Sequence, residues 1–132
     1  MMFDGINLTA VAVAGVASFL FGALWYGILG KAWMTAARLD PERTRPAALT
    51  MAIALVCQLL MAFVFAGVIY HLGNNGLKTG LISAGMIWTG FILTSQIVNH
   101  RFQGASWLLT LIDSGHWLGV LVVQALVITL WG

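Results

Sequence analysis

The sequence has few charged residues. Lys and Arg number six and Asp and Glu four among 132 residues, so 8% of the chain is charged, whereas hydrophobic residues make up 61%. A soluble domain carries about 25% charged residues, because its surface must face water. So few charged side chains cannot cover such a surface, which excludes a soluble globular enzyme and a disordered protein. The formal net charge of +2 gives no reason to expect nucleic acid as a partner.

Several chemical motifs are also missing. The single cysteine, Cys57, excludes a disulfide framework and a CxxC redox pair. No HExxH motif or glycine-rich phosphate loop is present, and His71, His100 and His116 fall at different expected depths, so we predict no metal site. The first apolar run lacks the glutamate that small multidrug exporters require. The sequence therefore identifies no catalytic residue and no cofactor.

What the sequence does contain is four apolar runs of about 20–25 residues, at positions 8–29, 47–70, 79–98 and 107–131. A helix needs roughly 20 residues to cross the hydrocarbon core of a bilayer. We predict an all-α integral membrane domain over residues 1–132, with four transmembrane helices whose short links make neighbours antiparallel. After the first run, KAWMTAARL predicts a short interfacial helix that turns Trp33 and Met34 toward lipid and ends before Pro41 and Pro46.

The basic residues are distributed unevenly over the links. Five of the six lie in the first and third links, and basic residues favour the cytoplasmic side of a membrane. We therefore expect links 30–46 and 99–106 in the cytoplasm and both termini outside, in a bacterial inner membrane. The five are Lys31, Arg38, Arg43, Arg45 and Arg101, against Lys78 on the opposite side.

Small residues recur at four-residue spacing in three of the runs, a pattern that lets membrane helices approach closely, within one chain or between subunits. The residues predicted to pack in this way are Ala14, Ser18, Gly22, Gly76, Gly80, Gly115 and Gly119. Aromatic residues gather at the predicted helix ends, where they are typical of the membrane interface. These expected anchors are Trp25, Trp33, Tyr70, Trp107 and Trp131.

Asp113 is the one acidic residue inside a predicted span, and His116 follows it by three positions. An ionisable group within a bilayer is costly, so it usually faces protein or water and often has a function. Matching of depths across the four helices predicts a polar cluster of Asp113 and His116 with Tyr26, Gln58, Gln96, Asn99 and Arg101. Two interpretations remain open: a network that fixes helix register, with Arg101 neutralising Asp113, or a site that handles protons or ions.

Four segments together resemble a known family. They are GALWYGILGKAWM at 22–34, LKTG at 77–80, TSQIVNHRF at 94–102 and LIDSGHWL at 111–118. The sequence is similar in these segments to the domain of unknown function 1761 family of small membrane proteins with four predicted spans. The resemblance implies that architecture and no activity.

Three functions are compatible with these features. The small-residue stripes and the absence of a soluble domain favour a structural or accessory membrane subunit, as a homo-oligomer or part of a larger membrane complex. The cluster around Asp113 favours a small transporter or channel for protons, ions or a small solute. A membrane enzyme acting on lipid has the least support, because no nucleophile and base are paired in the sequence. Membrane lipid is the partner expected in every case.

Overall fold

The computed structural model describes residues 5–40, 42 and 46–131, and in these residues the chain is helical, without strands. Asp4 and four residues of the first link, Pro41, Arg43, Thr44 and Arg45, lie outside the described residues. The helices are α1 (Leu8–Ala37), α2 (Ala48–His71), α3 (Leu77–Ile87), the π-helical segment η1 (Trp88–Leu93), α4 (Thr94–Phe102) and α5 (Trp107–Trp131).

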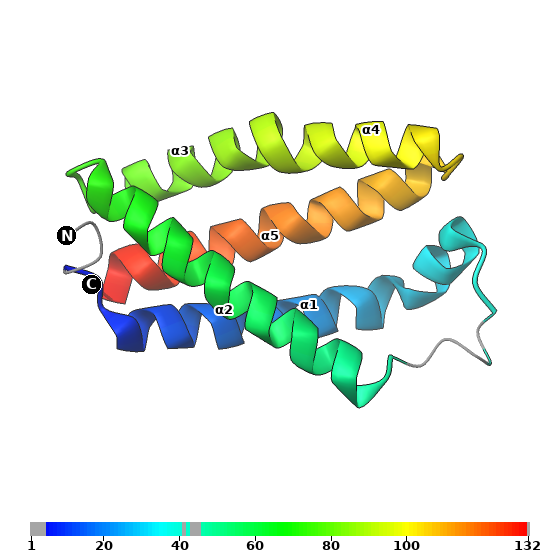
Figure 1. Ribbon diagram of the computed structural model, residues 1–132, viewed down its shortest axis with the longest axis horizontal. Coiled ribbons are helices and arrows are strands. Elements are labelled where there is room, and N and C mark those ends of the chain that lie inside the picture. The colour runs from blue at the N-terminus through cyan, green and yellow to red at the C-terminus, as the bar shows by residue number, and fades with distance from the viewer. Residues whose placement is uncertain (1–4, 41, 43–45, 132) are drawn as a thin grey trace.

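Four continuous helical stretches are long and apolar enough to cross a membrane, because α3, η1 and α4 follow one another without a break over Leu77–Phe102. This confirms the predicted all-α fold with four spans and makes the chain an integral membrane protein. Figure 1 shows the start of α1, the α2–α3 turn and the end of α5 at one end of the bundle. The end of α1, the start of α2 and the α4–α5 turn lie at the other end.

The first helix differs from the prediction. α1 continues without a break through Lys31 to Ala37, so the separate interfacial helix expected after residue 29 is not present. A helix of 30 residues is about 45 Å long and exceeds the roughly 30 Å hydrocarbon core by several turns. The last turns contain mostly good helix formers and are held against α5 by side-chain hydrogen bonds. α1 ends at Ala37, and the capping residue Arg38 that follows has a left-handed backbone with φ 57°.

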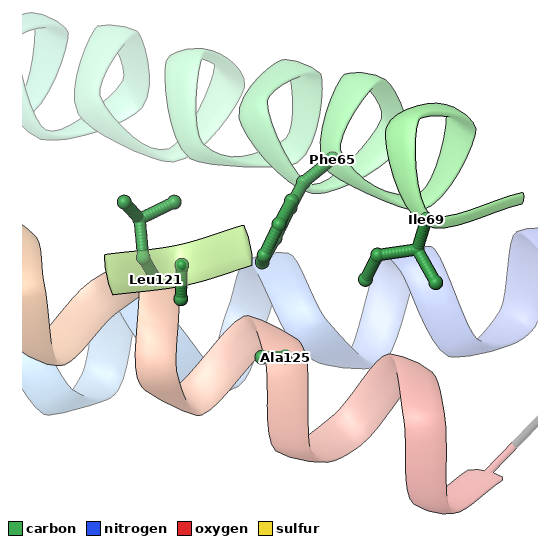
Figure 2. Close-up of a cluster of buried hydrophobic side chains, with 5 residues drawn as sticks. Phe65, Ile69, Leu121 and Ala125 are labelled. Atoms are coloured by element: carbon green, nitrogen blue, oxygen red, sulfur yellow. The ribbon is translucent and has the colours of Figure 1, made fainter. Parts of the chain in front are cut away.

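α5 is the central helix of the bundle. It contacts α1, α2 and α3, while α2 runs obliquely across α5 and α1 (Figure 1). One apolar cluster joins three of these helices, and Figure 2 shows Phe65 and Ile69 of α2 pointing toward Leu121 and Ala125 of α5. Ala84 of α3 completes this cluster. Together these side chains form an apolar core in the half of the bundle where α1 begins.

The small residues of α5 bring α1 close to it. A Cβ atom added at Gly119 would lie 2.2 Å from Cζ of Phe21, and one added at Gly115 would lie 3.0 Å from the ring of Trp25. Because large α1 rings occupy the space above both glycines, this stripe is a contact within the chain.

The remaining predicted packing residues divide into two groups. Gly80 of α3 lies against Thr129 of α5, and Ala14 is fully buried in a cluster with Ala62 of α2. Gly76 has a different role from the one predicted, because it is the exposed N-cap residue of α3 and approaches only Asn74 of its own turn. Ala14, Gly80, Gly115 and Gly119 thus pack within one chain.

Candidate functional site

Asp113 lies on the second turn of α5, half-buried against the last turns of α1. Its Oδ1 accepts hydrogen bonds from the Tyr26 hydroxyl at 2.7 Å and from Trp33 Nε1 at 3.1 Å. Tyr26 and Trp33 are seven residues apart, so they share one face of α1 two turns from each other. Continuation of α1 past Lys31 is therefore what brings Trp33 to the carboxylate.

In one of the two interpretations that the sequence left open, Arg101 neutralises Asp113, but the structure holds Arg101 elsewhere. Its Nη2 donates to the carbonyl of Ala105 and to Oγ1 of Thr110, both at 2.9 Å, and its guanidinium lies 3.6 Å from the ring centre of Trp107. The tight turn between α4 and α5 places these acceptors beside Arg101, so its side chain folds over the start of α5. The partners of Asp113 are neutral donors.

His116 lies one turn deeper than Asp113, surrounded by aromatic rings. Its ring centre is 4.9 Å from that of Tyr26, 4.6 Å from that of Trp117 and 6.3 Å from that of Phe21. The ring reaches α1 because Gly22 lacks a side chain; a Cβ there would lie 2.7 Å from Nε2. In the described part of the chain the imidazole forms no hydrogen bond, and its Nδ1 is buried without a partner. Most buried polar atoms in proteins have a hydrogen-bond partner, so this imidazole nitrogen is unusual.

A second polar group lies at mid-span and joins three helices. Ser18 of α1 donates to the side-chain Oε1 of Gln58 at 2.8 Å. Nε2 of Gln124 donates to Ser18 Oγ at 3.1 Å and to the backbone carbonyl of Gln58 at 3.2 Å. Ser18 and Gln124 are fully buried and Gln58 is 4% exposed. Sequence analysis placed Ser18 only in a packing stripe and left Gln124 out, although their shared mid-span depth is a signal that could have joined them to Gln58.

Gln96 and Asn99 do not reach the site, although the sequence placed them in the Asp113 cluster. Within the described residues α4 contacts α5 and η1 but neither α1 nor α2, so its side chains cannot meet Tyr26 or Gln58. Asn99 is exposed, and Gln96 Oε1 is buried without a hydrogen-bond partner. Depth matching was misleading here because it fixes the height of a residue and not its side of the bundle.

Two of the five expected interfacial aromatics point inward. Trp25 Nε1 donates to the Ile112 carbonyl at 3.1 Å, and Trp33 Nε1 donates to Asp113. A buried indole N–H needs such an acceptor, and α5 supplies both. The other three expected anchors, Tyr70, Trp107 and Trp131, are exposed. Trp88 of η1, which the sequence did not assign to the site, also reaches α5 and donates to the Ser114 carbonyl at 2.7 Å.

A cavity of about 900 Å³ opens between α1, α2 and α5 and extends to residues Leu39, Asp40 and Pro46 of the first link. We call it the α1–α2–α5 cavity. Its volume is within the range of sites that bind small molecules, roughly 300–1,000 Å³. Asp113 lies behind the cavity wall, where it accepts hydrogen bonds from two lining side chains, Tyr26 and Trp33. Its polar and aromatic lining includes Tyr26, Trp33, Thr50, Gln58, His116 and Trp117.

The lining combines apolar walls with a few polar groups that converge from different helices. Phe19, Met34, Met51 and Ala54 provide apolar surface, whereas the Gln58 amide lies at the deep end. This is the composition of a site that binds a molecule by shape and orients it by a few hydrogen bonds.

No curated protein and no solved structure matches this chain. A family model described as a protein of unknown function (DUF1761) matches residues 9–129, nearly the whole length. This match confirms the resemblance seen in the sequence, and the chain therefore belongs to the DUF1761 family.

Proposed function

We propose that this membrane protein binds a small, predominantly apolar molecule in the α1–α2–α5 cavity. The observation that carries the proposal is the cavity itself, about 900 Å³ in a chain of 132 residues. Such binding is the first step of the small-solute transporter among the three functions compatible with the sequence.

The physical support comes from packing. Membrane helices associate mainly through close van der Waals contact, because no hydrophobic force drives them together in lipid. A gap of this size forfeits those contacts along α1 and α2, so an occupant must restore them. Lipid chains would fill the space, but they would leave the amide nitrogen of Gln58 and the imidazole of His116 on its wall without hydrogen-bond partners. A molecule with an apolar body and a polar group satisfies both parts of the lining.

The alternative of an accessory subunit was favoured by the small-residue stripes and the absence of a soluble domain. The stripes support it less than the sequence suggested, because Gly115 and Gly119 contact α1 and Gly80 contacts α5 of the same chain. The lipid-acting enzyme still has no paired nucleophile and base in its favour. The cavity favours neither of these two functions.

Binding can be tested with the neutral fluorescent probe N-phenyl-1-naphthylamine and the protein in lipid nanodiscs. Trp33 and Trp117 line the cavity, so we expect saturable energy transfer from tryptophan to the probe. Ala54→Phe fills part of the cavity and should abolish the saturable component. Ala52→Phe makes the same change at an exposed position of α2 outside the lining and should leave it intact. Transfer that never saturates, or that is equal in both variants, would contradict the proposal.

A further inference from the structure

We propose that the α1–α2–α5 cavity selects a lipophilic cation, a molecule with an apolar body and a single positive charge such as an amine, quaternary ammonium or phosphonium group. This inference rests on the proposed function and names the class of molecule that the site takes. It depends on three independent features: the aromatic wall, the carboxylate behind it and the charges along the lining.

The wall of the cavity next to α5 is aromatic. The Tyr26 and Trp33 rings meet edge to face with centres 5.6 Å apart, and His116 connects Tyr26 to Trp117 through ring contacts of 4.9 and 4.6 Å. All four side chains line the cavity. Faces of Tyr and Trp rings carry negative charge density and attract cations, most strongly where water is excluded.

The carboxylate of Asp113 strengthens this attraction. The Tyr26 hydroxyl and the Trp33 N–H both donate to the same oxygen of Asp113, Oδ1. These bonds direct the polar ends of both side chains away from the cavity while the rings remain in its wall. Asp113 therefore lies one side chain behind the lining, where its charge acts across a medium of low dielectric constant.

The charges around the cavity are unfavourable for an anion. Among the described residues, no Lys or Arg lines the cavity, and Asp40 is the one charged residue in the lining. Arg101 of α4, the Lys or Arg nearest to Asp113 in the sequence, is held by hydrogen bonds to Ala105 and Thr110. The negative charge of Asp113 behind the aromatic wall therefore favours a cation over an anion, and over a neutral molecule of the same shape.

The test compares tetraphenylphosphonium with tetraphenylborate, two ions of nearly equal size and shape and opposite charge. Binding to the protein in nanodiscs is followed by quenching of tryptophan fluorescence, and the signal from empty nanodiscs is subtracted to remove partition into lipid. We expect saturable binding of tetraphenylphosphonium and none of tetraphenylborate. Equal or tighter saturable binding of tetraphenylborate would overturn the inference.

Two variants, each lacking one negative charge, test whether the preference for the cation depends on Asp113. Asp113→Asn keeps an acceptor for Tyr26 and Trp33 and should weaken binding of tetraphenylphosphonium about tenfold or more. Glu42→Gln makes the same charge change at an exposed residue outside the lining and should leave binding unchanged. Circular dichroism and thermal melting of each variant show that the bundle is intact. Binding that is unaffected by Asp113→Asn in a folded protein would overturn the inference.

The neutral probe separates this inference from the proposal on which it depends. If N-phenyl-1-naphthylamine binds saturably and tetraphenylphosphonium does not, the cavity is a binding site without preference for cations, and the inference is wrong. If neither compound binds, the proposed function fails as well. A preference for the cation that Asp113→Asn removes, with the neutral probe still bound, supports both.

Discussion

Asp113 is held by two neutral donors, and this determines how its substitutions should behave. Asn preserves an acceptor for Tyr26 and Trp33, so we expect Asp113→Asn to change the free energy of unfolding by less than about 1 kcal/mol. Ala removes the acceptor and leaves a hydroxyl and an indole N–H without a partner, which costs about 1–3 kcal/mol. Titration of the detergent-solubilised protein with sodium dodecyl sulfate, followed by circular dichroism, measures both values.

The two substitutions also decide between the present geometry and a buried ion pair. If a cation such as Arg101 neutralised Asp113, Asp113→Asn would leave that cation unpaired and would destabilise strongly, by about 3–5 kcal/mol. Equal effects of Asn and Ala would show that the bonds from Tyr26 and Trp33 contribute nothing to stability.

Gly119 permits the closest approach between α1 and α5. A methyl group there would meet the Phe21 ring at 2.2 Å, and that ring is confined by Trp25 and His116. We expect Gly119→Ala to lower the free energy of unfolding by about 1–3 kcal/mol through overpacking. Gly27→Ala is the matched control on α1, because nothing lies within 4 Å of its added Cβ, and it should be neutral or stabilising. Equal effects of the two substitutions would place Gly119 outside the helix contact.

At the scale of whole helices, Ser18, Gln58 and Gln124 set the register of α1, α2 and α5. A double-mutant cycle with Ser18→Ala and Gln124→Met should give a coupling energy of about 0.5–1.5 kcal/mol, the range found for hydrogen bonds between membrane helices. Ser18→Ala with Thr129→Val is the control pair, because the Thr129 hydroxyl bonds within its own helix to Ala125. Strictly additive effects in the first cycle would mean that the bonds contribute nothing to helix register.

Hydropathy was sufficient to predict the four helices, because each must satisfy its own backbone and present apolar side chains to lipid. It was insufficient at the end of α1. A separate interfacial helix was predicted after residue 29, but α1 continues because Trp33 is hydrogen-bonded to Asp113 of α5 and the Ala36 carbonyl to Ser106 just before α5. The predicted break concealed the relation between Tyr26 and Trp33, and with it the real partners of the carboxylate.

The polar cluster was predictable only in part, because the sequence indicates the depth of a residue but not which helices are neighbours. Tyr26 and Asp113 were placed together by depth and the structure joins them, whereas Gln96 and Asn99 share that depth on a helix that does not contact α1 or α2. Depth along a helix follows from counting residues. The side of the bundle depends on which helices are neighbours, and a four-helix sequence does not specify this.

At the scale of the molecule, the cavity was the feature that the sequence could not reveal. α2 runs obliquely across α1 and α5 (Figure 1), and its Phe65 and Ile69 pack against α5 (Figure 2). The cavity lies toward the start of α2, where Thr50 and Ala54 line it. No residue type indicates such a gap. Three residues of the predicted polar cluster, Tyr26, Gln58 and His116, nevertheless line this cavity.

The orientation of the bundle in the membrane is the last prediction. The uneven distribution of basic residues places the first and third links in the cytoplasm and Lys78, with both termini, outside. Cys57→Ala gives a chain without cysteine, in which Lys78→Cys and Glu42→Cys report on opposite ends of the bundle. Both positions are exposed, and neither substitution weakens the basic excess of the first link. An impermeant thiol reagent added to intact bacterial cells should label Lys78→Cys and should reach Glu42→Cys only after the cells are permeabilised. The reverse pattern would mean that the bundle has the opposite orientation in the membrane. Labelling of both positions in intact cells would mean that the protein inserts in two orientations.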